Sequence, residues 1–334
     1  MVCLALVFFY GSLGSTHALA SESFFYKEVN LIGGYSWRDH WVGKDNELFN
    51  SLGFEYYRKF SSDYGDYLTA DLQMRAAYDS TANSNHAWGL QIHNAWLLYK
   101  LTPEVKLRVG HFDPAFGLEP QLDTHATILQ TLVMKDIGFK KDWGAGLEGA
   151  LPKLDYKLAL QLGSGMSFYR QDGSFLLTSR IGSPKAENFQ YGLSLMYGDV
   201  LESAGMMSLP RPGLMPDKAV LKKRVGIDSQ YLFGPYLFKG EVAYGKNNKN
   251  EVVGYLAEID YTIPKYQNAE LELQYQSWIN ELGRGSTDDS TLTAGVSCRL
   301  NQSVTLRAAC ARDFNMAAQK EDTRFLVQFY FFGA

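Results

Sequence analysis

The stretch Tyr67–Asp79, YLTADLQMRAAYD, alternates between apolar and polar side chains. Asp71, Gln73 and Arg75 occupy alternate positions, and apolar side chains fill the positions between them: Leu68, Ala70, Leu72, Met74 and Ala76. A period of two residues is typical of a β-strand with one face in an apolar environment and the other in a polar one. The rest of the chain has to indicate what covers the apolar face.

The same alternation recurs from end to end, for example in DYKLALQLG (155–163). It predicts sixteen strands, at residues 28–37, 51–60, 66–78, 88–101, 104–111, 142–151, 154–163, 174–182, 188–198, 223–233, 236–246, 251–262, 268–278, 290–300, 303–313 and 323–332. Short connections alternate with longer polar or glycine-rich ones. An even number of strands with short turns at one end and long loops at the other is the layout of an outer-membrane barrel.

Aromatic residues support this interpretation, because amphipathic rings concentrate at the two membrane interfaces. We expect one girdle at the long-loop ends of the strands, formed by Trp37, Trp88, Trp143, Trp278, Tyr78, Tyr197 and Tyr244. The second girdle is expected at the short-turn ends, formed by Tyr156, Phe189, Tyr236 and Tyr261. The predicted fold class is therefore all-β: a transmembrane antiparallel β-barrel of about sixteen strands. The alternative is a soluble β-sandwich, β-helix or propeller.

Residues 1–20 contain an apolar stretch followed by Ala18-x-Ala20, which is typical of a secretory signal peptide cleaved before Ser21. No Lys or Arg precedes the apolar stretch, which departs from the usual pattern. Residues 21–334 are then a single barrel domain in a bacterial outer membrane, surrounded by lipid and lipopolysaccharide. The net charge of −4 argues against nucleic acid as a partner. Cys298 and Cys310 are too far apart along the predicted hairpin for a disulfide.

A barrel of sixteen strands is too wide for its own side chains to fill, so the sequence predicts an aqueous channel for passive diffusion of small hydrophilic solutes or ions. The third long loop, Phe112–Lys141, is the longest. We expect its apolar middle, around Ile128 and Leu132, to fold into the lumen and narrow it; a surface lid or a subunit contact is the alternative. The candidate constriction residues are Asp113, Phe116, Glu119, Asp123 and Lys135.

Alternation assigns eleven bases and nine acids to the lumen. The bases are Lys59, Arg75, Lys106, Arg108, Lys157, Arg180, Arg224, Lys239, Arg299, Arg307 and Arg324. The acids are Glu55, Asp71, Glu148, Asp228, Glu241, Glu258, Asp260, Glu270 and Glu272. Bases dominate strands five to eight and acids dominate strands eleven to thirteen, which predicts a transverse field but weak selectivity. In strand four, either Asn94, Trp96 and Lys100 or His93 and Tyr99 face inward.

Residues 94–120, NAWLLYKLTPEVKLRVGHFDPAFGLEP, resemble a hairpin of the phosphate-selective porin family. The matching positions are Gly110, His111, Phe112, Pro114, Phe116, Gly117, Leu118 and Glu119. The resemblance implies a sixteen-stranded homotrimer whose third loop enters the pore. It also implies that inward Arg and Lys select anions such as phosphate, although the near balance of inward charges predicts a weaker preference here.

Two other functions are weighed against a channel. A barrel could be a scaffold or receptor for a partner protein that threads its lumen. A barrel enzyme is the other alternative, but the histidines are scattered and no HExxH, GxSxG or Cys/His metal spacing occurs. The sequence therefore predicts a non-enzymatic channel without cofactor or metal.

Overall fold

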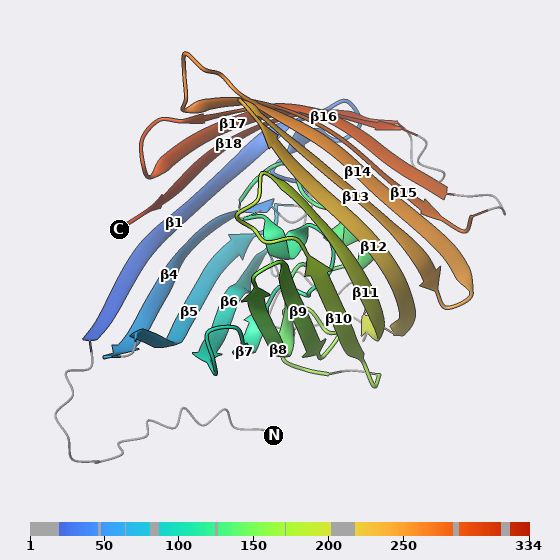
Figure 1. The fold of residues 1–334 in the computed structure, drawn as a ribbon. Coiled ribbons are helices and arrows are strands. Elements are labelled where there is room, and N and C mark those ends of the chain that lie inside the picture. Colours follow the sequence, from blue (N-terminus) through green and yellow to red (C-terminus); the bar gives the residue numbers. More distant parts are fainter. Residues whose placement is uncertain are drawn as a thin grey trace.

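The computed structural model describes residues 20–45, 48–63, 65–80, 87–123, 126–170, 172–201, 218–282, 287–314 and 321–334. The predicted signal peptide lies outside these ranges except for Ala20, where the first strand begins. The strands form a single antiparallel sheet that curves into a ring, as Figure 1 shows. Within the described ranges, no helix has the length and apolar character needed to cross a membrane.

Sixteen long strands make the wall. They are β1 (Ala20–Ser36), β4 (Leu48–Ser62), β5 (Gly65–Tyr78), β6 (Trp88–Lys100), β7 (Lys106–Phe112), β8 (Asp142–Leu151), β9 (Leu154–Gln161), β10 (Phe175–Gly182), β11 (Phe189–Leu201), β12 (Ala219–Phe233), β13 (Tyr236–Asn247), β14 (Asn250–Thr262), β15 (Ala269–Asn280), β16 (Thr287–Arg299), β17 (Val304–Phe314) and β18 (Thr323–Gly333). Two short strands, β2 (His40–Val42) and β3 (Lys44–Asp45), lie between β1 and β4. Each predicted strand corresponds to one of the sixteen.

The ring closes between the first and last long strands. β1 pairs with β18 over Lys27–Ser36 and with β4 over Ala20–Asn30, always antiparallel. Each long strand is thus hydrogen-bonded on both sides, which removes the open edges that a sheet in lipid could not satisfy. The predicted fold class, a closed transmembrane barrel of sixteen strands, is confirmed.

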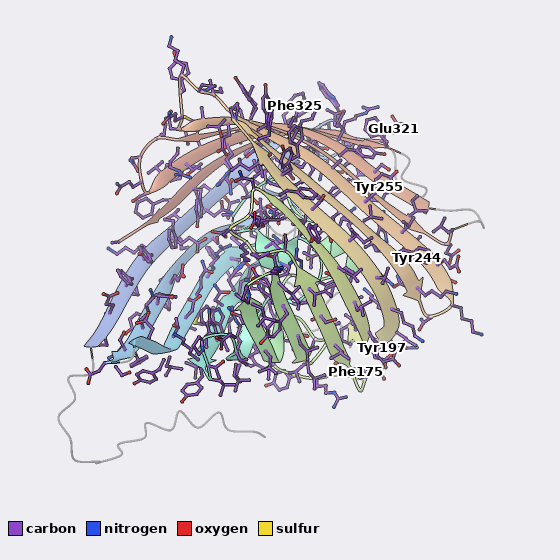
Figure 2. The ribbon with its side chains drawn as sticks, viewed as in Figure 1. Phe175, Tyr197, Tyr244, Tyr255, Glu321 and Phe325 are labelled. Atoms are coloured by element: carbon purple, nitrogen blue, oxygen red, sulfur yellow. The ribbon has the colours of Figure 1, made fainter. Side chains whose placement is uncertain are left out.

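The two faces of the wall differ as the alternation predicts. In β5, Asp71, Gln73 and Arg75 are buried inside the barrel, whereas Leu72 between them is exposed on the outside. Large apolar side chains such as Tyr197, Tyr244 and Phe325 cover the outer surface, as Figure 2 shows. An apolar outer face around a polar interior is the arrangement of a barrel in lipid.

Two details of the sequence prediction are wrong. The alternation of short and long connections predicts a long loop between β13 and β14. In the structure this connection is a tight turn, in which only Asn248 and Lys249 separate the two strands. Asn248 has a φ of 52°, a conformation that asparagine tolerates in tight turns. Trp278 does not belong to the aromatic girdle: it is 4% exposed and packs inside the barrel, because it has the same parity in β15 as the inward Gln274 and Gln276.

The two cysteines are free, as predicted. In the β16–β17 hairpin Cys298 lies opposite Leu306, and Cys310 lies opposite Ala294. The two thiols are therefore four residues apart along the ladder, which at about 3.4 Å per residue exceeds the reach of a disulfide.

Candidate functional site

The segment between β7 and β8 lies inside the ring of strands over the residues that the structure describes, 113–123 and 126–141. It carries two short helical turns, η2 (Glu119–Gln121) and α1 (Val133–Asp136), and appears in green within the barrel in Figure 1. The amide of Ala115 donates to Thr178 Oγ1 at 2.9 Å, and the amide of Gly117 donates to Ser194 Oγ at 3.1 Å. Both hydroxyls belong to buried positions of the wall, in β10 and β11.

The motif Pro114–Glu119 fixes the beginning of this segment against the wall. The Phe116 ring lies over Gly226, where an added Cβ would come within 2.9 Å of it. Gly117 has a φ of 63° and abuts the Glu241 carboxylate. Leu118 is fully buried with Leu132 and Leu256. The residues that carry the resemblance to phosphate-selective porins thus have a structural task, which is to dock the segment onto β11–β14.

The apolar middle of the segment contacts the wall on two sides. Ile128 and Leu129 cluster with Ile32, Ala309 and Leu326, which come from β1, β17 and β18. Val133 and Ile137 belong to another cluster, whose wall residues lie in β10, β11, β13, β14 and β15: Leu176, Met196, Val200, Ala243, Val252 and Trp278. Apolar contacts therefore hold the segment at both flanks.

Inward bases satisfy backbone carbonyls of the segment, which has little secondary structure of its own. Lys157 Nζ donates to the carbonyl of Pro120 at 2.8 Å, and Lys222 Nζ donates to that of Ile137 at 2.8 Å. Arg307 donates to the carbonyl of Ala126 at 3.0 Å. Part of the positive charge predicted for the lumen is thus directed at the protein's own backbone.

Most of the predicted lumen bases are also paired with acids. Ion pairs on the wall join Arg75 to Glu28 (2.7 Å), Arg108 to Glu148 (2.9 Å), Arg180 to Asp228 (2.5 Å), Lys239 to Glu258 (2.5 Å) and Asp260 (2.6 Å), and Arg324 to Asp313 (3.3 Å). Arg224 pairs with Asp136 and Lys135 pairs with Asp289, which ties α1 to β12 and β16. Such pairing reduces the field that a passing ion experiences.

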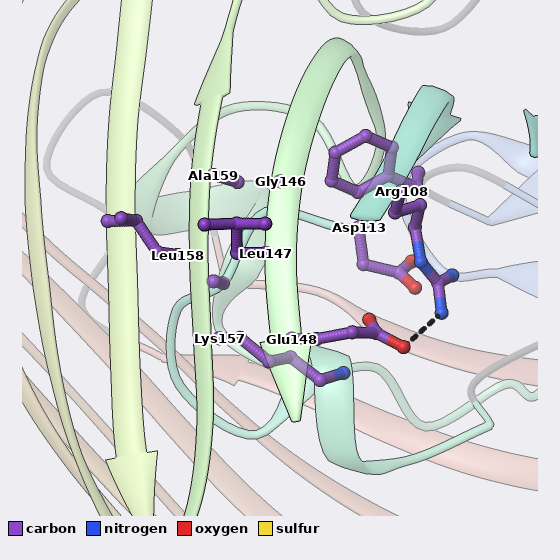
Figure 3. A pocket seen from close by; sticks show the side chains of 10 residues that line it. Arg108, Asp113, Gly146, Leu147, Glu148, Lys157, Leu158 and Ala159 are labelled. Atoms are coloured by element: carbon purple, nitrogen blue, oxygen red, sulfur yellow. Dashed lines mark hydrogen bonds and ion pairs between the residues drawn. The ribbon is translucent and has the colours of Figure 1, made fainter. Parts of the chain in front are cut away.

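Arg108, Glu148, Lys157 and Asp113 converge on a small pocket between β7, β8 and β9, shown in Figure 3. Lys141 Nζ lies 2.6 Å from Asp113 Oδ1. Burial raises the pKa of the Asp113 carboxyl, but attraction to Lys141, and to Lys157 and Arg108 nearby, outweighs it and holds that pKa below its ordinary value. The structure therefore keeps Asp113 ionised at the root of the loop.

The other predicted site residues lie in separate places. Lys106 and Arg108 are on β7, the fifth long strand, while Glu270 and Glu272 are on β15, the thirteenth, so they face each other across a ring of sixteen. Arg299, Arg307 and Asp123 line a cavity on the short-turn side of the loop. Arg324 lies near the start of β18, at the opposite end of the barrel and away from this group.

The sequence left two alternative inner faces for strand four, and several inward charges were missed. Asn94 donates to Asp71 at 2.9 Å and the Arg108 guanidinium lies 4.4 Å from the Trp96 ring centroid, so the Asn94, Trp96 and Lys100 face is the inner one. The missed residues include Glu28, Lys222, Asp142 and Asp313. Lys222 has the parity of Arg224 but precedes the predicted start of its strand, so extending the alternation would have found it.

No family model and no curated protein matches the chain. Among solved structures, the chain resembles the trimer form of OmpT, an outer membrane protein of Vibrio cholerae, with 11% identity over 94% of this chain and 99% of that one and a TM-score of 0.64. It also resembles an anion-selective porin from Comamonas acidovorans, with 11% identity, coverage of 94% and 100%, and a TM-score of 0.66. The outer membrane channel DcaP of Acinetobacter baumannii gives 14% identity, coverage of 93% and 97%, and a TM-score of 0.61.

At these identities the likeness shows the fold. The chain has the barrel architecture of outer-membrane porins, and the predicted location in a bacterial outer membrane agrees with the matched proteins and with the closed barrel. The narrower resemblance to the phosphate-selective type remains a prediction.

Proposed function

We propose that this barrel is an outer-membrane channel through which small hydrophilic solutes and ions, including anions of the size of phosphate, diffuse passively without covalent chemistry. The observation that supports this most directly is the closed ring of sixteen strands with apolar side chains outside and charged side chains inside. Eight strands would be filled by their own side chains, whereas sixteen leave room for water.

In this proposal residues 113–141 narrow the lumen. Leu118, Leu132 and Ile137 are fully buried within the barrel, which favours a constriction over an external lid or a subunit contact. The candidate constriction residues Asp113, Phe116, Glu119, Asp123 and Lys135 all belong to this segment. Its attachments on two sides of the wall would confine solutes to the space that it leaves.

Weak ionic selectivity is part of the proposal. Many inward bases are paired with acids or donate hydrogen bonds to loop carbonyls, and the inward acids missed from the sequence offset the small excess of bases. The opposition of Lys106 and Arg108 to Glu270 and Glu272 would orient dipolar solutes between the two walls. Small neutral and anionic solutes would pass, and apolar ones would be hindered.

Homotrimeric assembly is also proposed, on the support that the fold is shared with a protein solved in a trimer form. In this arrangement outer-membrane lipid and lipopolysaccharide would cover the outward apolar side chains that do not face another subunit. Crosslinking of the detergent-solubilised protein tests this directly, since a trimer gives a product of three chains and a monomer does not.

Ionic current through a planar bilayer tests the channel itself. The purified mature protein is expected to produce discrete steps of current, because an aqueous lumen conducts ions. A barrel that serves as a scaffold, as a receptor for a threaded partner or as an enzyme with a filled lumen would insert without such steps. Absence of steps from a folded, inserted protein would therefore rule out the proposal.

Charge variants on the facing walls should shift selectivity in opposite directions. Replacing Lys106 and Arg108 by Gln is expected to lower the anion-to-cation permeability ratio, since Glu148 then loses its partner and adds negative charge. Replacing Glu270 and Glu272 by Gln should raise the ratio. The measurement is the reversal potential in a salt gradient, and Lys27→Gln, on the outward face of β1, is the matched control. Equal reversal potentials in all variants would contradict the lumen assignment.

A further inference from the structure

Five aromatic side chains face the interior at the short-turn end of the barrel, where a polar lining is the expectation. Phe24 and Tyr26 of β1 have the same parity as the inward Glu28. The other three are Tyr57 of β4 and Tyr330 and Phe332 of β18. All five line a single cavity of about 740 Å³ between the inserted loop and the rim. None of these rings contributes to the outer girdles.

The rings form a continuous strip along the wall. The Tyr26 and Phe332 rings are stacked with centroids 4.8 Å apart. Phe24 lies beside Tyr26 with centroids 6.3 Å apart and planes within 7°, and Tyr330 lies beside Phe332 at 6.4 Å with planes within 9°. Neighbouring rings therefore follow one another along the wall, and each of them borders the cavity. Phe24 is 42% exposed although it lies on the inner face, so the strip is accessible from the cavity.

Charged side chains of both signs surround the strip. Arg299 and Arg307 line the cavity from β16 and β17, while Glu55 lines it from β4 and Asp123 from the inserted loop. The Arg307 guanidinium lies 5.6 Å from the Tyr330 ring centroid, which places a donor directly beside the aromatic surface. Two bases and two acids give the cavity donors and acceptors without an excess of either charge.

We propose that this cavity is a binding subsite for neutral saccharides on their way through the channel. The apolar C–H face of a pyranose ring can lie on an aromatic side chain, while its hydroxyls donate to carboxylates and accept from guanidinium groups. The balance of charge favours a neutral polyhydroxylated ligand over an ion, and the series of rings suits a linear oligosaccharide. The cavity volume is within the range of small-molecule sites.

The proposed function enters this inference only in the statement that the saccharide passes through the channel. The experiment therefore measures saccharide binding separately from ionic conduction. Calorimetric titration of the folded protein with maltotriose, in an amine-oxide detergent that carries no sugar headgroup, is expected to show saturable binding. Mannitol, an open-chain polyol without a ring face, should not bind at the same concentrations. In planar bilayers maltotriose should reduce the ionic current, most strongly when it is added on the short-turn side.

Removing the central rings tests the aromatic strip. The double variant Tyr26→Ala with Phe332→Ala is expected to weaken maltotriose binding by about tenfold, in line with the contribution of aromatic contacts. The matched control is Phe325→Ala with Phe329→Ala, because these side chains of β18 point outward. The bulk-preserving variant Tyr26→Leu with Phe332→Leu, checked for folding by circular dichroism, should lose affinity as well.

Three results would overturn the subsite: no binding of maltotriose, equal binding of mannitol, or equal losses in the inward and outward variants. Tighter binding of benzoate than of maltotriose would also overturn it, in favour of a site for aromatic acids. A protein that binds maltotriose but gives no current steps would keep the subsite and disprove the channel. Current steps without saccharide binding would do the reverse.

Discussion

At the scale of single residues, Gly117 shows how the loop depends on one backbone position. Its φ of 63° favours glycine, and a Cβ there would lie 1.9 Å from a Glu241 carboxylate oxygen. Gly173 has a similar φ of 71° but nothing within 4 Å of an added Cβ. Gly173→Ala should therefore cost about 1 kcal/mol of backbone strain, whereas Gly117→Ala should cost more because the loop also has to move.

The measurement is the urea midpoint of each folded variant in detergent, together with the noise of its open-channel current. Gly117→Ala should lower the midpoint further than Gly173→Ala and should increase the noise. Equal midpoints for the two variants would mean that the contact between Gly117 and Glu241 has no part in holding the loop.

A second prediction at this scale concerns Asp113 and pH. Its folded pKa is depressed, so its stabilising contribution is present above the unfolded pKa of about 3.9 and is lost as pH falls through the lower folded value. Lys141→Met removes the strongest attraction and leaves burial, the largest single influence on Asp113, opposed only by Lys157 and Arg108, which should raise the folded pKa above the unfolded one. The sign then reverses, and the variant should lose stability as pH rises from 4 to 7.

Urea midpoints at pH 4 and pH 7 check this, with a difference of about 1.4 kcal/mol in stability for each unit by which the two pKa values separate. Lys249→Met, in the exposed turn between β13 and β14, is the control and should leave the pH profile unchanged. Parallel profiles for wild type and Lys141→Met would show that Lys141 does not govern Asp113.

For single residues, the sequence was enough to predict whether a side chain points into the barrel or away from it. Asp71, Gln73 and Arg75 point inward because a period of two leaves them no other common direction. Their partners were out of reach: Arg75 pairs with Glu28 from another strand, and that pairing depends on the register between strands. Trp278 was placed in the girdle by residue type, although its parity already indicated the lumen.

At the scale of elements, the inserted segment determines how wide the passage is. Deleting Thr124–Met134 removes Ile128 and Leu129, which contact β1, β17 and β18, and Leu132 and Val133, which contact the other side. The single-channel conductance should rise, because the residues that remain anchored near Gly117 no longer extend across the lumen to the opposite wall. Circular dichroism of the deletion variant should show an intact barrel, since none of the deleted residues that the structure describes, 126–134, belongs to a strand.

Unchanged conductance of a folded deletion variant would favour the alternative in which the segment is a lid. From the sequence, the length and apolar middle of this loop already indicated that it folds against something. The particular contacts were unpredictable, since they join residues such as Leu129 and Leu326 that are distant in the chain. The two-residue turn after Asn247 was missed for a different reason: its polar residues resemble a longer loop.

At the scale of the whole molecule, alternation and connection lengths were enough to predict the number of strands and therefore the class of barrel. Each strand is a local pattern, and antiparallel neighbours follow from short connections. Closure joins β1 to β18, for which no local signal exists. It follows instead from the requirement that a sheet in lipid has no free edge, because unpaired backbone groups there would have no hydrogen-bond partner.

An engineered disulfide across the closing seam tests both closure and sidedness. Leu31 lies opposite Phe329 in the β1–β18 register, and both side chains are exposed on the outer face. With Cys298 and Cys310 replaced by Ser, Leu31→Cys with Phe329→Cys should oxidise to an intramolecular crosslink, visible as a mobility shift on a non-reducing gel. A crosslink that joins nearly the whole chain should stabilise the barrel by on the order of 5 kcal/mol.

The control is Leu31→Cys with Gln328→Cys. Gln328 is adjacent to Phe329 but faces the lumen, so a cysteine introduced there points away from the outer face and its thiol should stay free. If the control pair crosslinked and the outward pair did not, the seam would be shifted by one residue, and the apolar face of β18 would line the channel.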